Sequence, residues 1–295
     1  MKIEGKGGIT AEVVADSISP HGIRLITLQL HYHRFIHQEF LTHRMFSRNS
    51  SSSRAIPIEK EMERVRNNPA TPIYWGKNKP GMQADEELEG IDLQQCINEW
   101  FSAAENATYS AEWFRDYNLH KQIANRGLET YQFIDTVVTA TEWDNFFELR
   151  LDKGAQPEIQ ELAKCMKEAI DNSNPRSLVK RQWHLPYIQW GLDSDNYNHE
   201  LIKCSIARCA RVSYRNHDNS EPNIEKDIQL YDKLLESKHL SPFEHVATPM
   251  EDPIWYSSSD ISGTFALKGS THGDKDGYLW SGNFRGWIQY RQCLN

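Results

Sequence analysis

The chain has 295 residues and a formal net charge of −8, with 39% hydrophobic and 25% charged residues, which is ordinary for a soluble globular protein. The acidic balance argues against a general coat on DNA or RNA, where a broad basic face is expected, although it leaves room for a pocket that binds one nucleotide. Five cysteines without a CxxC pair, a start without a signal-peptide apolar region and the absence of a long apolar run predict a cytoplasmic protein with reduced thiols and no membrane partner.

Residues 9 to 32 predict two strands. The sequence ITAEVVADSI is followed by the turn SPHG and by IRLITLQLHY, in which two sets of residues alternate. Three histidines follow closely, at His31, His33 and His37. Their spacing allows a metal-site interpretation, but no companion carboxylate is placed as in HExxH, so we expect no metal.

The most informative stretch runs from His43 to Arg54 and reads HRMFSRNSSSSR. We call it the donor segment, because it combines arginines, serines, an asparagine and a histidine without any acidic residue. Arginine presents a fork of N–H donors that suits phosphate, and serine and asparagine add short donors. A serine run alone is typical of a flexible surface loop. Here the apolar run before it and the sequence AIPIEK after it indicate a loop held between structured elements, which favours a binding site.

Residues 67 to 83 contain three prolines and two glycines, which predicts a long irregular loop. Its Tyr74 and Trp75 can either cover a ligand or pin the loop to the body of the protein, and we favour the second interpretation. A long amphipathic helix should follow, with apolar residues at intervals of three and four from Leu93 to Phe114. We expect this apolar face to be core.

Residues 136 to 173 contain NFFELR at 145–150 and AQPEI at 155–159. Thr141 with Asp144 suggests a helix start, and Pro157 suits the first turn of the next helix. Asn145 and Arg150 lie close enough on the first helix to point into one site. By periodicity alone, Arg150 is better explained as a solvated charge.

The carboxyl-terminal part contains CARVSYRN at 209–216 and KHLSPFEH at 238–245. Residues 174–208 and the Gly-, Ser- and aromatic-rich tail from 247 onward match no pattern that we can assign.

Taken together, these stretches resemble the flavin-dependent thymidylate synthases. The family signature RHRxxSxNExSxR corresponds to THRMFSRNSSSSR, and NFxxLR…AQxEI, ARVSY and HxSPFEH have counterparts. In the usual family order the last two motifs precede the arginine-rich motif, whereas here they follow it. The chain therefore resembles a circularly permuted, enlarged member, which is physically tolerable when the original termini lie close together.

The resemblance implies an α+β fold, with an antiparallel or mixed sheet flanked by long helices, in one catalytic domain over residues 1–295. Residues 1–173 would carry the arginine-rich and NFxxLR motifs, 174–208 a connection, and 209–295 the remaining motifs with an extension. It also implies reductive methylation at carbon 5 of dUMP, with methylenetetrahydrofolate as carbon donor, FAD as hydride carrier and NADPH as reductant. A homotetramer with active sites built from several chains is expected.

The resemblance implies a role for each matched residue. The catalytic residues would be Arg150, Arg44 and Ser52, with Arg150 on the uracil carbonyl edge. The cofactor-binding residues would be His43, Asn145, His239, Asn49 and Arg48. The substrate-binding residues would be Arg54, Ser52, Ser53, Arg44, Arg126 and Arg150. No serine is assigned as a nucleophile, and Glu244 is expected to orient its neighbours.

Two departures from the signature keep alternatives open. Thr42 stands where the family has its first arginine, and Ser50 stands where it has glutamate. They can compensate each other, or they can mark another pyrimidine nucleotide such as dCMP, or hydroxymethylation in place of methylation. The other classes considered are a catalytically silent nucleotide-binding homologue and a metal-dependent hydrolase that uses His31, His33 and His37.

Overall fold

The computed structural model describes residues 1–188, 199–212, 220–254 and 268–294. The helices in these ranges are α1 (His37–Leu41), α2 (Ile58–Asn67), α3 (Gly90–Asp116), α4 (Lys121–Ala124), α5 (Asp144–Arg150), α6 (Pro157–Asp171), α7 (His199–Arg211) and α8 (Ile224–Glu236). The 3-10 helices are η1 (Lys6–Gly8), η2 (Arg34–Ile36), η3 (Asn125–Tyr131), η4 (Ser241–His245) and η5 (Tyr290–Cys293). Among these residues, no helix has the length and apolar character needed to cross a membrane.

The strands are β1 (Lys2–Glu4), β2 (Thr10–Ile18), β3 (Arg24–His33), β4 (Ser47–Ser50), β5 (Phe133–Ala140), β6 (Arg176–Ser177), β7 (Ala247–Pro249), β8 (His272–Gly273), β9 (Leu279–Ser281), β10 (Phe284–Arg285) and β11 (Trp287–Gln289). Within the described ranges, the main sheet has six strands in the order β1-β2-β3-β5-β4, with β6 joined in parallel to β2 and all other pairs antiparallel. The predicted α+β class with an antiparallel or mixed sheet is confirmed.

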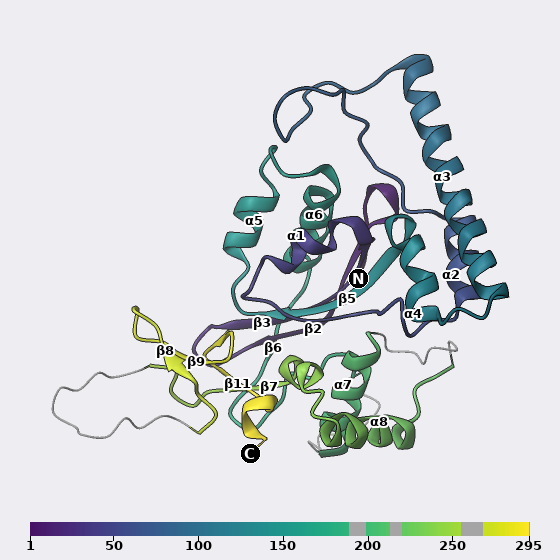
Figure 1. Cartoon of the computed structure of the whole chain (residues 1–295). Coiled ribbons are helices and arrows are strands. Elements are labelled where there is room, and N and C mark those ends of the chain that lie inside the picture. The colour runs from purple at the N-terminus through teal and green to yellow at the C-terminus, as the bar shows by residue number, and fades with distance from the viewer. Residues whose placement is uncertain (189–198, 213–219, 255–267, 295) are drawn as a thin grey trace.

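Both faces of the main sheet are covered (Figure 1). On one face, α1, α5 and α6 pack against Ile26, Leu28 and Leu30 of β3. On the other face lie α7, η4 and the short strands β7 and β11, where Trp287 packs near Leu25. Because both faces of the sheet are covered, β3 is buried along most of its length, even though its side chains point alternately to the two faces.

Several predicted elements are confirmed. The two strands around SPHG are β2 and β3, and Gly22 takes a φ of +75° in the turn between them. Pro157 is the first residue of α6. α5 begins at Asp144, as expected. The Thr141 hydroxyl does not cap this helix; it accepts a hydrogen bond from the backbone N–H of Arg285 instead.

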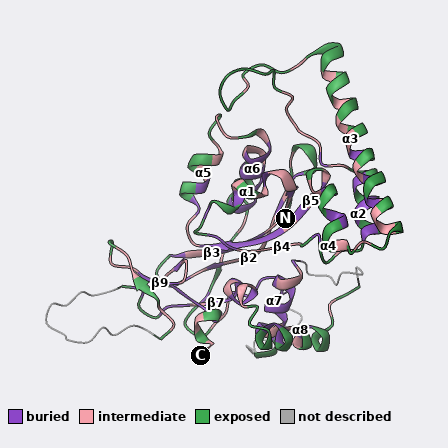
Figure 2. Ribbon diagram, viewed as in Figure 1, coloured by how far each residue is buried: buried purple, intermediate pink, exposed green. Residues whose placement is uncertain are grey.

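The prediction that the apolar face of α3 is core is only partly right. Ala104 and Ala111 are buried, but Phe101 and Cys96 are exposed, and so is Trp113 further along the helix. Figure 2 shows α3 exposed along most of its length. Periodicity identified the helix and its apolar side correctly, because both depend on local sequence. It carried no information on whether another part of the same chain covers that side.

The irregular loop between α2 and α3 is confirmed, and Trp75 packs edge-on against Trp100 of α3 with ring centroids 6.1 Å apart. This contact agrees with the interpretation that the aromatic residues of the loop pin it to the body.

Candidate functional site

The centre of the donor segment is a strand rather than the loop expected from its sequence. Residues Ser47–Ser50 form β4, at the edge of the main sheet, and pair with β5 in the register Ser47 to Thr139 and Asn49 to Val137. Backbone hydrogen bonds to β5 therefore hold the middle of a serine-rich sequence that has little strand propensity of its own. The two flanks of β4 have turn conformations.

The SPFEH motif packs directly on β4. The Asn49 Nδ2 donates to Ser241 Oγ at 3.0 Å, and Asn49 Oδ1 lies 2.9 Å from His245 Nε2. Ser47 Oγ donates to Glu244 Oε2 at 2.9 Å. These contacts join residues 192 to 197 positions apart in the chain. They place the carboxyl-terminal motif beside the arginine-rich one, as the permutation hypothesis requires.

The NFFELR helix reaches the other flank of β4. Arg150 donates from Nε to His43 Nε2 at 2.9 Å, and its two terminal nitrogens lie 3.3 Å from Glu39 Oε2 and Thr42 Oγ1. Since His43 accepts at Nε2, its single ring proton is on Nδ1. Burial lowers the pKa of His43 to about 4, helped by the positive charges of Arg150 and Arg48, so the imidazole is neutral at pH 7.

These contacts give a physical account of one departure from the signature. Thr42, in place of the first arginine, offers an oxygen to Arg150. An arginine at position 42 would instead bring a second positive charge against the same guanidinium. Ser50, in place of glutamate, makes a 2.9 Å hydrogen bond with Thr136 on β5.

A cavity of about 520 Å³ lies between the donor segment and α5. Its polar lining includes His43, Arg44, Asn145 and Arg150, and Met45 and Leu149 are among its apolar side chains. Arg44 and Asn145 are exposed, whereas His43 is buried. Within the described part of the chain, the Arg44 side chain has no hydrogen-bond or ion-pair partner. The cavity therefore presents a guanidinium and an amide that are available to a ligand.

Arg48, in β4, does not line the cavity but contacts a residue that does. Its Nη1 donates to the His43 carbonyl oxygen at 2.7 Å. Burial lowers its pKa, while Tyr32 and Glu244 act in the opposite direction. The half-buried guanidinium thus ties the start of the donor segment to β4.

The other end of the donor segment has a separate set of contacts. Ser53 is buried and donates to Glu129 Oε1 at 2.8 Å. The same oxygen accepts from Arg126 at 2.9 Å and lies 3.3 Å from Arg34. Ser52 and Arg54 are exposed, and among the described residues neither side chain has a protein partner. This end therefore also presents unpaired donors.

A family model described as thymidylate synthase complementing protein matches residues 18–176, which is more than half of the chain. The chain belongs to this family. Membership supports the coarse form of the prediction, a methyltransferase of the thymidylate synthase complementing type. The match covers the donor segment and NFFELR, whereas SPFEH lies beyond it.

Solved structures similar to this chain include the UMP/dUMP methylase PolB from Streptomyces cacaoi, bound with 5-Br UMP or with 5-Br dUMP. Each is 19% identical and covers 57% of this chain, and the matches span 91% and 92% of those chains with TM-scores of 0.45 and 0.47. No curated protein matches the sequence.

In this member of the family, the predicted site residues other than His239 fall into three groups. His43, Arg44, Asn145 and Arg150 meet at the cavity. Arg48 and Asn49 lie in β4, and Ser52, Ser53, Arg54 and Arg126 lie at its far end. His239 is not brought to the cavity lining, since it precedes η4 with an exposed side chain and a backbone N–H bonded to the Leu234 carbonyl.

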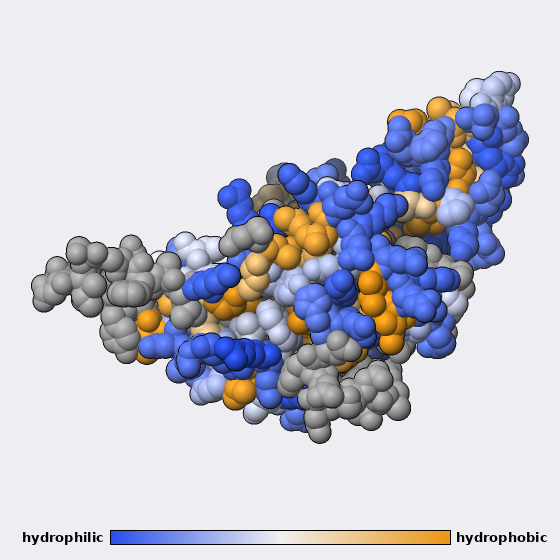
Figure 3. Space-filling model, turned by 90° about the horizontal axis from the view of Figure 1, so that it is seen from below, coloured by the Kyte–Doolittle hydropathy of each residue, from blue (hydrophilic) through white to orange (hydrophobic). Residues whose placement is uncertain are grey.

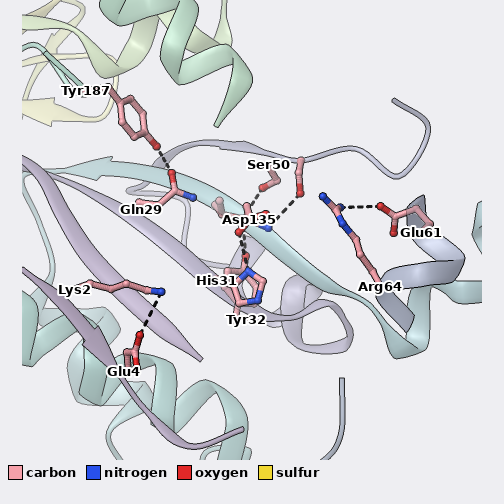
Figure 4. Close-up of polar contacts among 12 residues, drawn as sticks. Lys2, Glu4, Gln29, His31, Tyr32, Ser50, Glu61, Arg64, Asp135 and Tyr187 are labelled. Atoms are coloured by element: carbon pink, nitrogen blue, oxygen red, sulfur yellow. Dashed lines mark hydrogen bonds and ion pairs between the residues drawn. The ribbon is translucent and has the colours of Figure 1, made fainter. Parts of the chain in front are cut away.

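The histidines of the metal hypothesis do not share a site. His31 Nδ1 lies 2.8 Å from Asp135 Oδ1, as Figure 4 shows, and His37 bonds to the Tyr32 hydroxyl. His33 is enclosed by Phe35 and Phe133. In the ranges that the structure describes, no group of three or more His, Cys, Asp or Glu side chains is placed to hold a metal ion.

Sequence reasoning missed the residues that support the donor segment from the carboxyl-terminal tail. Asn283 Nδ2 donates to the Met45 carbonyl at 2.9 Å, and Gln289 Nε2 donates to Asn283 Oδ1 at 2.8 Å and lies 3.2 Å from Ser47 Oγ. Arg291 pairs with Glu244. These residues belong to no motif. The strand pairing of β9 with β10 brings them into place through the turn at Gly282, which has a φ of +59°.

Proposed function

We propose that the chain is a flavin-dependent thymidylate synthase that methylates carbon 5 of dUMP. The observation that carries the proposal is the 2.9 Å contact between Arg150 and His43, which unites two motifs about a hundred residues apart at one cavity. Membership of the thymidylate synthase complementing family supports the same reaction class. The proposal extends to the whole chain as one catalytic domain, because residues of both halves build β4 and its surroundings.

The nucleotide would be held by the unpaired donors. A phosphate dianion in a pocket needs charge-assisted donors, and Arg54 and Ser52 provide them at one end of β4. Arg150 would grip the uracil carbonyl edge and stabilise negative charge that develops on the ring. Its contacts to Glu39 and Thr42 are long, at 3.3 Å, so these nitrogens can turn to a ligand at low cost.

The residues at the cavity fit a planar heterocycle with carbonyl acceptors. Asn145 and Arg44 offer N–H donors, His43 offers a neutral imidazole, and Met45 and Leu149 offer apolar surface. FAD would be held here, with Arg48 and Asn49 supporting the wall, and it would supply the hydride that NADPH replenishes while methylenetetrahydrofolate supplies the carbon. The protein would contribute placement and positive charge. His239 would contact the cofactor only if a second chain brought it there.

We also propose a homotetramer with shared sites. Arg44 and Arg54 lie on opposite flanks of β4, whose first and last Cα atoms are roughly 10 Å apart at the usual strand rise. The donor-segment residues that line the cavity come from one flank only. An apolar surface is available for assembly, since Phe101, Tyr109 and Trp113 of α3 are 46%, 68% and 50% exposed. Figure 3 shows apolar residues on the lobe at the right, the side that carries α2 and α3 in Figure 1.

The decisive experiment is the visible absorption spectrum of the purified protein after incubation with FAD and desalting. We expect oxidised-flavin bands that remain with the protein and shift on addition of dUMP. Formation of dTMP from dUMP with methylenetetrahydrofolate and NADPH then separates an enzyme from a silent nucleotide-binding homologue. A product from dCMP, or a hydroxymethylated product, would favour the alternative that Thr42 and Ser50 left open. Absence of retained flavin and of turnover would overturn the proposal.

A further inference from the structure

A continuous line of polar side chains crosses the main sheet and ends at the donor segment; its first five members are buried, and its last two are half-buried. In order, its members are Ser17, His184, Thr27, Thr139, His245, Asn49 and Ser241. His184 lies 2.8 Å from Ser17 Oγ through Nδ1 and 2.8 Å from Thr27 Oγ1 through Nε2. The two threonine hydroxyls are 2.7 Å apart, and Thr139 Oγ1 lies 2.7 Å from His245 Nδ1. His245 Nε2 lies 2.9 Å from Asn49 Oδ1, and Asn49 Nδ2 lies 3.0 Å from Ser241 Oγ. We call this line the buried relay.

The strands dictate how the relay forms. Thr27 on β3 and Thr139 on β5 are direct partners in the antiparallel register, so their hydroxyls face each other on the same side of the sheet. His184 and His245 close the line from the carboxyl-terminal half, where His184 forms a bridge to Ala247, the first residue of β7. Neither Thr139 nor His184 belongs to a family motif.

The protons on the relay have a fixed order. An Asn49 amide that donates to Ser241 presents only its oxygen to His245, so His245 must carry its proton on Nε2. A neutral His245 then accepts at Nδ1 from Thr139. Thr139, having used its proton, accepts from Thr27.

The same reasoning continues to the far end. Thr27 has given its proton to Thr139, so it accepts from His184 Nε2, and His184 Nδ1 accepts from Ser17. Every hydrogen bond therefore points from Ser17 toward Ser241, and both histidines carry the proton on Nε2.

Burial keeps both histidines neutral, as this order requires. His184 and His245 are 1% and 0% exposed, and desolvation lowers the pKa of each to about 3. Thr27 and Thr139 are fully buried, so any member left without its partner would suffer the full penalty of an unsatisfied buried polar group. Reversal of the Asn49 amide would require the whole line to reverse together, including both tautomers.

We infer that Thr139 and His184 are positioning residues, which act through the buried relay to lock the Asn49 amide with its N–H side available at the donor segment. One Nδ2 proton goes to Ser241, and the second has no partner among the described residues. The ligand atom that meets Asn49 is accordingly an acceptor, such as a carbonyl oxygen or an unprotonated ring nitrogen of a bound heterocycle. The identity of that heterocycle as flavin or pyrimidine rests on the proposed function, but the order of the protons does not.

The test uses the full-length protein, labelled with ¹⁵N-histidine, and magic-angle-spinning NMR without added ligand. His184→Gln and His245→Gln assign the two ring signals. We expect both rings as neutral Nε2–H tautomers at pH 7. In Thr139→Val the Nδ1 signal of His245 should shift, because that nitrogen loses its hydrogen-bond donor. Thr139→Ser, which keeps the hydroxyl, should restore the wild-type pattern.

Ligand affinity provides the second readout. Thr139→Val should weaken FAD retention about tenfold, and Thr139→Ser should bring it back, whereas a merely structural threonine would lose affinity with both. If Thr139→Val fails to fold, Thr27→Val interrupts the line at the neighbouring hydroxyl and has the same expected pattern. An Nδ1–H tautomer at either histidine, or signals unchanged in the valine variant, would overturn the inference. Correct tautomers in a protein that retains no flavin would instead contradict the proposed function alone.

Discussion

The middle and the two flanks of the donor segment are similar in composition but differ in their surroundings. In the middle, Ser47, Asn49 and Ser50 all have side-chain partners on β5, on η4 or in the tail. On the flanks, Arg44, Ser52 and Arg54 are exposed, and none of them has a side-chain partner in the part of the chain that the structure describes. The side chains of the middle are thus bonded mainly within the protein, although the second Nδ2 proton of Asn49 stays available to a ligand, whereas these three flank side chains keep all their donors available among the described residues. Substitutions in the middle should mainly reduce stability, while substitutions on the flanks should mainly reduce binding.

The largest expected effect is on nucleotide binding by a flank. Arg54→Ala should weaken affinity for dUMP by roughly 2–5 kcal/mol, because the phosphate loses a charge-assisted partner in the bound state. Isothermal titration calorimetry measures this change. Arg66→Ala removes an arginine whose partner is Glu112 on α3, away from the donor segment, and serves as the control. Unchanged affinity in Arg54→Ala would refute the phosphate assignment.

Arg150→Ala tests the α5 residue that contacts His43 on the cavity-facing flank of the donor segment. Turnover should fall by about 100-fold, or about 3 kcal/mol in activation free energy, as is typical when one donor to developing negative charge is removed. Flavin content should fall much less, since His43, Asn145 and Arg44 remain. Steady-state kinetics and the flavin-to-protein absorbance ratio give the two quantities, with Lys153→Ala, in the turn after α5, as the matched loss of a cation. Loss of flavin with normal turnover per bound flavin would contradict the role of Arg150.

Substitutions in the middle of the donor segment should, in contrast, mainly reduce stability. Asn49→Ala removes the acceptor of His245 and a donor to Ser241, which should lower the free energy of unfolding by about 1–3 kcal/mol. Ser52→Ala, only three residues away, should leave it within about 0.5 kcal/mol. Urea denaturation of the two variants measures both. Equal effects on stability would mean that the middle and the flanks do not differ as described.

The smallest expected effect is a dependence on pH. The pKa of His245 is about 3 in the folded protein, below its ordinary value of 6.5. The unfolded chain therefore binds a proton that the folded chain does not, so the free energy of unfolding falls as the pH falls from about 6.5 toward 3. The slope from one such histidine reaches at most about 1.4 kcal/mol per pH unit. Denaturation series at pH 7, 6 and 5 should give a shallower slope for His245→Gln than for the wild type, and identical slopes would disprove the neutral, buried state of His245.

Local features of the sequence predicted a large part of the fold. The alternation in β3, the period of α3 and the proline at the start of α6 depend on nearest neighbours, so each was correctly expected. The residues that meet at the cavity were also expected, because Arg150 and His43 belong to recognisable motifs. Family membership is confirmed, while the individual roles remain proposals.

What could not be predicted depends on distant partners. Residues 47–50 form a strand because β5 and η4 receive them, and nothing in SRNS indicates this. Thr139 and His184 are short or isolated polar residues without periodicity, and their importance becomes apparent only when three strands and the carboxyl-terminal half meet. Asn283 reaches Met45 across 238 positions. The exposure of Phe101 was not predicted, because an apolar stripe in a sequence does not reveal whether the residues that cover it belong to the same chain.

The contacts between β4 and η4 also have a consequence for biosynthesis. They join positions separated by more than 190 residues, so they raise the contact order of the chain and cannot form until η4 has left the ribosome. A nascent chain that ends before residue 241 would contain the arginine-rich motif and NFFELR and still lack the partners of Asn49. Completion of the site is thereby linked to the synthesis of η4, long after β4 has been made.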